Sequence, residues 1–71
     1  MTIGEAMRAA REKAGYTRNK LARKSGVAVS CISGYERDQF EPKISKVEML
    51  ADTLGISIDE YIGHEVIQND R

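Results

Sequence analysis

The chain has 71 residues, enough for one small domain with a single core, and its 11 basic and 11 acidic side chains leave no net charge at pH 7. No run approaches the roughly 20 apolar residues that span a bilayer, and the N-terminus lacks the apolar block of a signal peptide, so a cytoplasmic protein is expected. The single cysteine cannot form an internal disulfide and no Cys or His cluster has zinc-ligand spacing, so no metal or other cofactor is expected.

The charges are unevenly distributed along the chain. Residues 1–24 contain seven basic and two acidic side chains, whereas residues 44–71 contain two basic and six acidic side chains. This asymmetry favours an orientation in which the N-terminal part faces a polyanion. Two ordinary solvated helix faces would explain the same counts.

The first predicted helix lies between Thr2 and Gly15. Thr2 and Glu5 have the spacing of a capping box, in which each residue satisfies a backbone N–H of the other. Apolar residues then recur every three or four positions until Gly15, as in a helix with one buried face. They are Ile3, Met7, Ala10 and Ala14.

Two further helices are predicted on either side of Gly26. Thr17 is a suitable N-cap for a helix that runs to about Lys24, and a third helix runs over about residues 28–36 and buries Ile32 and Tyr35. Glycine adopts left-handed conformations at little cost, so the chain can reverse direction at Gly26 without a long loop. Two helices that cross steeply at such a turn leave one face of the second free to enter a nucleic-acid groove.

The C-terminal part predicts two more helices. A polar loop leads to Pro42, and Phe40 within this loop is expected to pack back on the core. A fourth helix follows and ends at Gly55, with its apolar stripe formed by Ile44, Val47, Leu50, Ala51 and Leu54. Ser57 and Glu60 form a second capping box, which begins a short fifth helix that ends at Gly63. The predicted domain therefore covers residues 1–63, followed by a tail, 64–71, that is frayed or part of a dimer contact.

This order of five short helices resembles the lambda-repressor-like and Cro-like helix-turn-helix family, also called XRE-like. The resemblance rests on the stretch LARKSGVAVSCISGYER, on the Pro42 loop, and on the stretch LADTLGISIDEYI. It implies an all-α, compact five-helix domain that binds double-stranded DNA sequence-specifically as a transcriptional regulator. It also implies that the third helix, about 28–36, lies in the major groove.

The resemblance also assigns positions that read bases. They fall on Val29, Ser30 and Gly34, with Ala28 and Ser33 beside them. The family often has Gln, Arg, Asn or Thr here, whose side chains form paired hydrogen bonds to base edges. Val29 and Gly34 cannot form such bonds, so we expect modest direct readout and a larger contribution from DNA shape.

The resemblance further implies phosphate contacts from Arg18, Arg37 and Lys43. Arg18 occupies a position where the family favours glutamine, and a guanidinium suits a phosphate even better. Arg11 and Glu36 match positions that form a partly buried ion pair behind the recognition helix in the family. The alternative for Arg11 is a place on the basic face, in contact with phosphate.

Two questions remain open at the level of sequence. A homodimer is expected, with the contact formed by the fifth helix and the tail through Tyr61, Ile62, Val66 and Ile67. The competing function is a protein-interaction module, such as an antitoxin or an adaptor, on the same fold. An enzyme is not expected, because no nucleophile, base or metal constellation is present.

Overall fold

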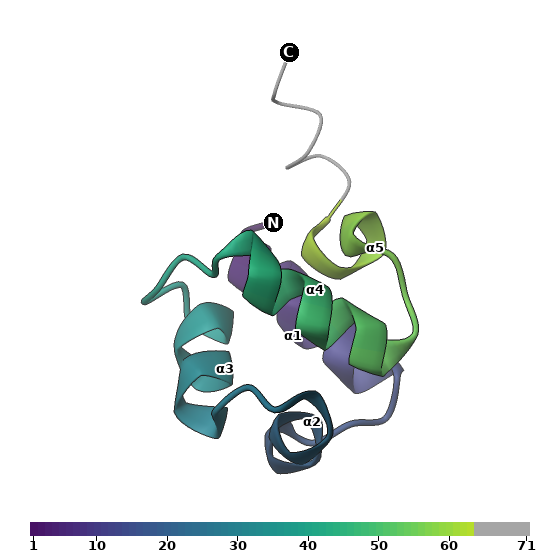
Figure 1. The fold of residues 1–71 in the computed structure, drawn as a ribbon. Coiled ribbons are helices and arrows are strands. Elements are labelled where there is room, and N and C mark those ends of the chain that lie inside the picture. Colours follow the sequence, from purple (N-terminus) through teal and green to yellow (C-terminus); the bar gives the residue numbers. More distant parts are fainter. Residues whose placement is uncertain (64–71) are drawn as a thin grey trace.

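The computed structural model describes residues 1–63, which form five α-helices and no strand (Figure 1). The helices are α1 (Ile3–Lys13), α2 (Arg18–Ser25), α3 (Val29–Glu36), α4 (Ile44–Leu54) and α5 (Ile58–Ile62). None of these helices is long and apolar enough to cross a membrane. The predicted all-α, five-helix fold is confirmed.

Local hydrogen bonds set the starts of three helices. The hydroxyl of Thr2 accepts a hydrogen bond from the backbone N–H of Glu5 at 3.1 Å, and the Glu5 carboxylate accepts one from the Thr2 N–H at 2.9 Å. Ser57 and Glu60 form the same capping box at the start of α5. Thr17 caps α2 through the N–H of Lys20 at 3.1 Å. The three predicted caps are therefore confirmed, and each satisfies donors that a helix leaves unpaired at its first turn.

The core takes one large, fully buried side chain from each helix: Met7, Leu21, Ile32, Leu50 and Tyr61. In Figure 1, α4 is drawn in front of α1, while α2 and α3 lie together on one side of α4 and α5 lies on the other. Helix α3 packs on α1 and α2, so its orientation depends on both. A single core thus fixes the helix-turn-helix pair against the rest of the domain.

Two apolar side chains lie elsewhere than predicted. Ile44 is 62% exposed, because it is the first residue of α4 and its Cβ leans toward the N-terminus, beyond the packed part of the helix. Phe40 is 54% exposed and lies on α3 rather than in the core. Both were predicted to contribute to the core.

Two residues predicted to form the dimer contact lie in the core instead. Tyr61 is fully buried and Ile62 is only 9% exposed, because the short helix α5 turns its apolar face toward α1 and α4. They are core residues, and the prediction that places them in a dimer contact is wrong. Val66 and Ile67 lie outside the described residues.

Candidate nucleic-acid interface

The turn between α2 and α3 centres on Gly26. Its φ of 83° is in the left-handed region, and its N–H donates to the carbonyl of Ala22 at 2.9 Å, which closes α2. The next residue, Val27, is 1% exposed and anchors the turn in the core. A shallow concavity follows the outside of the turn and is lined by Asn19, Ala22, Arg23, Gly26, Val27, Ala28 and Val29. The sequence thus folds into a helix-turn-helix with a solvent-facing groove between its two helices.

The exposed part of α3 is its N-terminal end. Ala28, Val29 and Ser30 are all exposed, and Val29 retains 40% of its accessible surface. Ala28 is the N-cap of α3 and makes no side-chain cap hydrogen bond. Ser33, one turn later, is half-buried. The structure therefore brings three of the five predicted base-reading residues together on one free surface.

Gly34 does not belong to this surface. It is buried, and a Cβ added at this position would overlap Cδ2 and Cε2 of the Phe40 ring. The Gly34 carbonyl also accepts a hydrogen bond from the Gln39 N–H at 2.8 Å. The prediction that Gly34 faces outward to read bases is wrong, because the missing side chain makes room for the loop that follows α3.

Three charged side chains meet behind α3. Arg11 Nε lies 2.7 Å from Glu36 Oε2, and Arg11 Nη2 lies 3.1 Å from Glu36 Oε1. Arg18 Nε lies 3.0 Å from the same Oε1. The side chains of Glu36 and Arg11 are 1% and 7% exposed. The structure thus brings the predicted partners Arg11 and Glu36 together and adds Arg18, which no local pattern in the sequence assigns to this cluster.

The charge of Glu36 outweighs the effect of burial on Arg11. The hydrogen bonds that Arg11 donates to Glu36 raise the pKa of the Arg11 guanidinium above its ordinary value. Arg11 Nη1 also donates to the backbone carbonyl of Tyr16 at 2.8 Å. Arg11 is therefore held from three of its nitrogens and is not on the basic surface, so the alternative of an Arg11 phosphate contact is wrong.

The remaining predicted phosphate contacts lie at the two ends of the loop after α3. Arg37 is the C-cap of α3 and Lys43 is the N-cap of α4, and both side chains are exposed. Between them, Asp38 has a φ of 60°, a left-handed conformation that aspartate tolerates better than most residues. Its carboxylate accepts hydrogen bonds from Thr2 Oγ1 at 2.7 Å and from the Gly4 N–H at 3.0 Å. This contact ties the loop to the start of α1.

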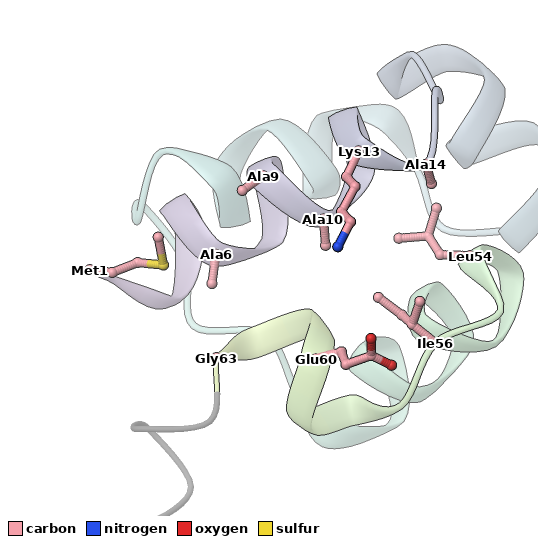
Figure 2. Close-up of a pocket in the computed structure, with 10 residues that line it drawn as sticks. All are labelled: Met1, Ala6, Ala9, Ala10, Lys13, Ala14, Leu54, Ile56, Glu60 and Gly63. Atoms are coloured by element: carbon pink, nitrogen blue, oxygen red, sulfur yellow. The ribbon is translucent and has the colours of Figure 1, made fainter.

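A separate apolar groove of about 540 Å³ lies between α1 and α5 (Figure 2). It is lined by Met1, Ala6, Ala9, Ala10, Lys13, Ala14, Leu54, Ile56, Glu60 and Gly63. Figure 2 shows Lys13 and Glu60 extending over it from the two helices. None of the predicted base or phosphate contacts lines this groove, so it is distinct from the surface of α2 and α3.

The described residues 1–63 contain no group of three or more His, Cys, Asp or Glu side chains that could hold a metal ion. Cys31 is half-buried and is a free thiol. The arrangement is one of exposed small side chains flanked by cations, which suits binding to a polyanion.

Comparison with known proteins agrees with this geometry. The family described as helix-turn-helix (HTH_3) matches residues 7–61, and the chain belongs to this family. The immunity repressor protein of Bacillus phage phi105 is 33% identical over 67 residues, which cover 94% of this chain and 46% of that repressor. The chain spans about half the length of this repressor and of the transcriptional regulator ImmR of Bacillus subtilis, which is 31% identical over 67 residues.

Two solved structures are particularly informative. The biofilm regulator SinR in complex with DNA superposes with a TM-score of 0.75 at 35% identity, covering 79% of this chain and 90% of that one. A complex of the SinR and SinI proteins gives a TM-score of 0.79 at 31% identity, covering 93% and 65% of the two chains. The predicted lambda-repressor-like fold is confirmed, and the chain is a helix-turn-helix domain of the kind that transcriptional regulators carry.

Proposed function

We propose that this chain binds double-stranded DNA sequence-specifically as the DNA-binding domain of a transcriptional regulator, with α3 in the major groove. The carrying observation is the free N-terminal end of α3, where Ala28, Val29 and Ser30 are exposed beside α2. A helix presented in this way fits the width of the major groove. The similar structure of SinR is a complex with DNA, which supports the proposed DNA binding.

The proposed readout follows from the chemistry of the three side chains. The methyl groups of Val29 and Ala28 can contact the methyl group of thymine, and the hydroxyl of Ser30 can bond to most bases. Ser33 is half-buried and contributes at the edge of the contact. Because no side chain here forms paired hydrogen bonds to a base, much of the specificity comes from the shape and deformability of the DNA.

Phosphate contacts fix the register of α3 in this proposal. Arg37 and Lys43 are exposed at either end of the loop after α3, and Arg18 is the first residue of α2 with a 37% exposed side chain. Arginine and lysine at these positions neutralise phosphates and release counterions, so binding is strongly salt-dependent. The zero net charge of the chain is compatible with this, because residues 1–24 are basic and the acidic excess lies after residue 44.

A homodimer on a two-fold-symmetric site is part of the proposal. Helix α3 has 8 residues, which correspond to about 12 Å and cover one half-site only. Two copies would place their α3 helices about 34 Å apart, one turn of DNA. A selection of bound duplexes should therefore yield paired half-sites at this spacing, and a single unrepeated motif would contradict the dimer. A cytoplasmic location belongs to the same proposal.

The test is a titration of random duplex DNA at two salt concentrations. Affinity should fall steeply with salt, with a slope of about 0.9 in log units per phosphate contact. Arg37→Ala and Lys43→Ala should each reduce this slope by about one unit. Lys13→Ala is the matched control, since it removes one positive charge in the groove between α1 and α5 and should leave the slope unchanged. Absence of binding at low salt would refute the proposal.

The second candidate is a protein-interaction module, such as an antitoxin or an adaptor, on the same fold. Two observations favour it: the chain has no net charge, and the SinR protein of similar fold forms a complex with the SinI protein. A chain that binds no duplex at low salt supports this candidate. An enzymatic role is not proposed, because the named relatives are repressors and transcriptional regulators.

A further inference from the structure

The Glu36 carboxylate holds two guanidinium groups at once. Its Oε2 accepts from Arg11 Nε at 2.7 Å, and its Oε1 is shared between Arg11 Nη2 at 3.1 Å and Arg18 Nε at 3.0 Å. The side chain is 1% exposed, so water cannot replace these donors. Glu12, whose Oε2 lies 3.9 Å from Arg11 Nη2, also pairs with Arg8, so the three arginines and two glutamates of this group have one positive charge in excess.

This excess charge reaches solvent at Arg18. Arg11 is 7% exposed, and its Nη1 is fixed on the carbonyl of Tyr16, so Arg11 cannot turn outward. The side chain of Arg18 is 37% exposed at the first residue of α2. A cation at this position lies at the positive end of the helix dipole, which is unfavourable, and Thr17 already caps the helix. Helix formation therefore does not explain an arginine here.

The geometry leaves the outer part of the Arg18 guanidinium available. Glu36 takes the Nε–H, and within residues 1–63 the two Nη groups of Arg18 make no hydrogen bond. A guanidinium fixed through Nε presents its Nη hydrogens as a planar fork, which matches two oxygens of a phosphate. Lysine cannot offer this combination, because its ammonium is a single point charge on a flexible stem.

We propose that Glu36 is a positioning residue that orients Arg18 for paired hydrogen bonds to a DNA phosphate. The inference rests on the proposed DNA binding and deepens it. Glu36 closes α3 and Arg18 opens α2, so the ion pair couples the recognition helix to the phosphate contact that sets its register. Fixing the guanidinium before binding also reduces the entropy lost on association.

The test compares Arg18→Lys with Arg18→Ala in duplex binding at several salt concentrations. Positioning predicts that Arg18→Lys loses about tenfold in affinity, nearly as much as Arg18→Ala, because both lose the fork. The salt slope should stay unchanged in Arg18→Lys and become shallower by about one unit in Arg18→Ala. If Arg18→Lys binds as tightly as the wild type, Arg18 acts as a simple charge and the inference is overturned while the proposed function stands.

The Glu36→Gln variant distinguishes a positioning role from a simple charge effect, because the two predict opposite changes in the affinity for DNA. The substitution removes a negative charge 3.0 Å from Arg18, so charge alone predicts tighter binding to DNA. Positioning predicts weaker binding, because a neutral amide holds the guanidinium less firmly. Circular dichroism establishes whether this variant folds, and if it does not, the Arg18 variants decide. Wild-type protein that binds no duplex at low salt overturns the proposed function and this inference together.

Discussion

The two ends of α3 differ in how they are held. At the C-terminal end, Glu36 is paired with Arg11 and Arg18, and Gly34 is covered by the ring of Phe40. At the N-terminal end, Ala28 caps the helix without a side-chain hydrogen bond. One end is therefore fixed by polar and van der Waals contacts, and the other presents small, free side chains to solvent.

The two ends of α3 therefore have different roles: the C-terminal end fixes the position of the helix, and the N-terminal end is the one proposed to contact bases. A buried carboxylate is tolerated only when it is paired, so the geometry at Glu36 is strictly defined. The exposed residues Val29 and Ser30 contribute little to the core and can be exchanged at small cost to stability. Substitutions at the anchored end should therefore affect folding, whereas those at the free end should affect the choice of DNA sequence.

The largest effect is expected for Glu36→Ala. The substitution leaves the buried Arg11 guanidinium without its carboxylate, and the free energy of unfolding should fall by roughly 3–5 kcal/mol. Urea denaturation measures this. Arg8→Ala is the matched control, because its ion pair with Glu12 is exposed and should be worth under about 1 kcal/mol. An unchanged unfolding midpoint in Glu36→Ala would show that the ion pairs of Glu36 do not stabilise α3.

Gly4→Ala tests the approach of α1 to the same end of α3. A Cβ at Gly4 would lie 2.5 Å from the carbonyl oxygen of Tyr35 and 2.7 Å from that of Glu36. These are backbone atoms, which cannot swing aside, so we expect a loss of about 1–3 kcal/mol in the free energy of unfolding. Alanine is the better helix former, and a variant with a higher urea midpoint would therefore contradict the close packing.

Val29→Gln tests the free end. Glutamine adds an amide that can pair with adenine, so preference at one base pair per half-site should change by roughly 1–3 kcal/mol. The salt slope and the urea midpoint should stay as in the wild type, because Val29 is exposed and carries no charge. Competition between duplexes that differ at single positions measures the effect. A variant with the wild-type preference at every position would mean that α3 does not lie in the groove as proposed.

The smallest effect is expected for Tyr61→Phe, close to Glu36 and Arg11. Among residues 1–63 the fully buried Tyr61 hydroxyl has no hydrogen-bond partner, so its removal should stabilise the domain by up to about 1 kcal/mol at neutral pH. Burial, reinforced by the charge of Glu36, raises the pKa of Tyr61 above its ordinary value of 10.0.

The raised pKa also gives a pH dependence with a definite sign. The folded state keeps the Tyr61 proton at a pH where the unfolded chain has lost it. The free energy of unfolding therefore has its full value below about pH 10 and decreases as the pH rises further. Tyr61→Phe should therefore lose less stability than the wild type between pH 9 and pH 11, values of pH chosen to bracket the unfolded pKa of about 10. Parallel losses in urea denaturation would exclude Tyr61 as the responsible group.

Local chemistry was sufficient to predict the helices. Thr2, Thr17 and Ser57 cap their helices through residues three positions later, and Gly26 and Gly55 end helices in the left-handed conformation. These features depend on backbone donors within one turn, which neighbouring residues satisfy wherever the helix lies in the fold. The order of the helices, and with it the helix-turn-helix fold, could therefore be predicted from the sequence.

The sequence by itself thus determined the five helices, the turn at Gly26 and the exposed start of α3. Only the tertiary structure decided that Gly34 lies under Phe40 and that Arg18 shares the carboxylate of Glu36. The physical reason is distance along the chain. Helix periodicity reports which residues share a face, but the partner of each face is set by packing between helices, and Arg18 and Glu36 meet across 18 positions.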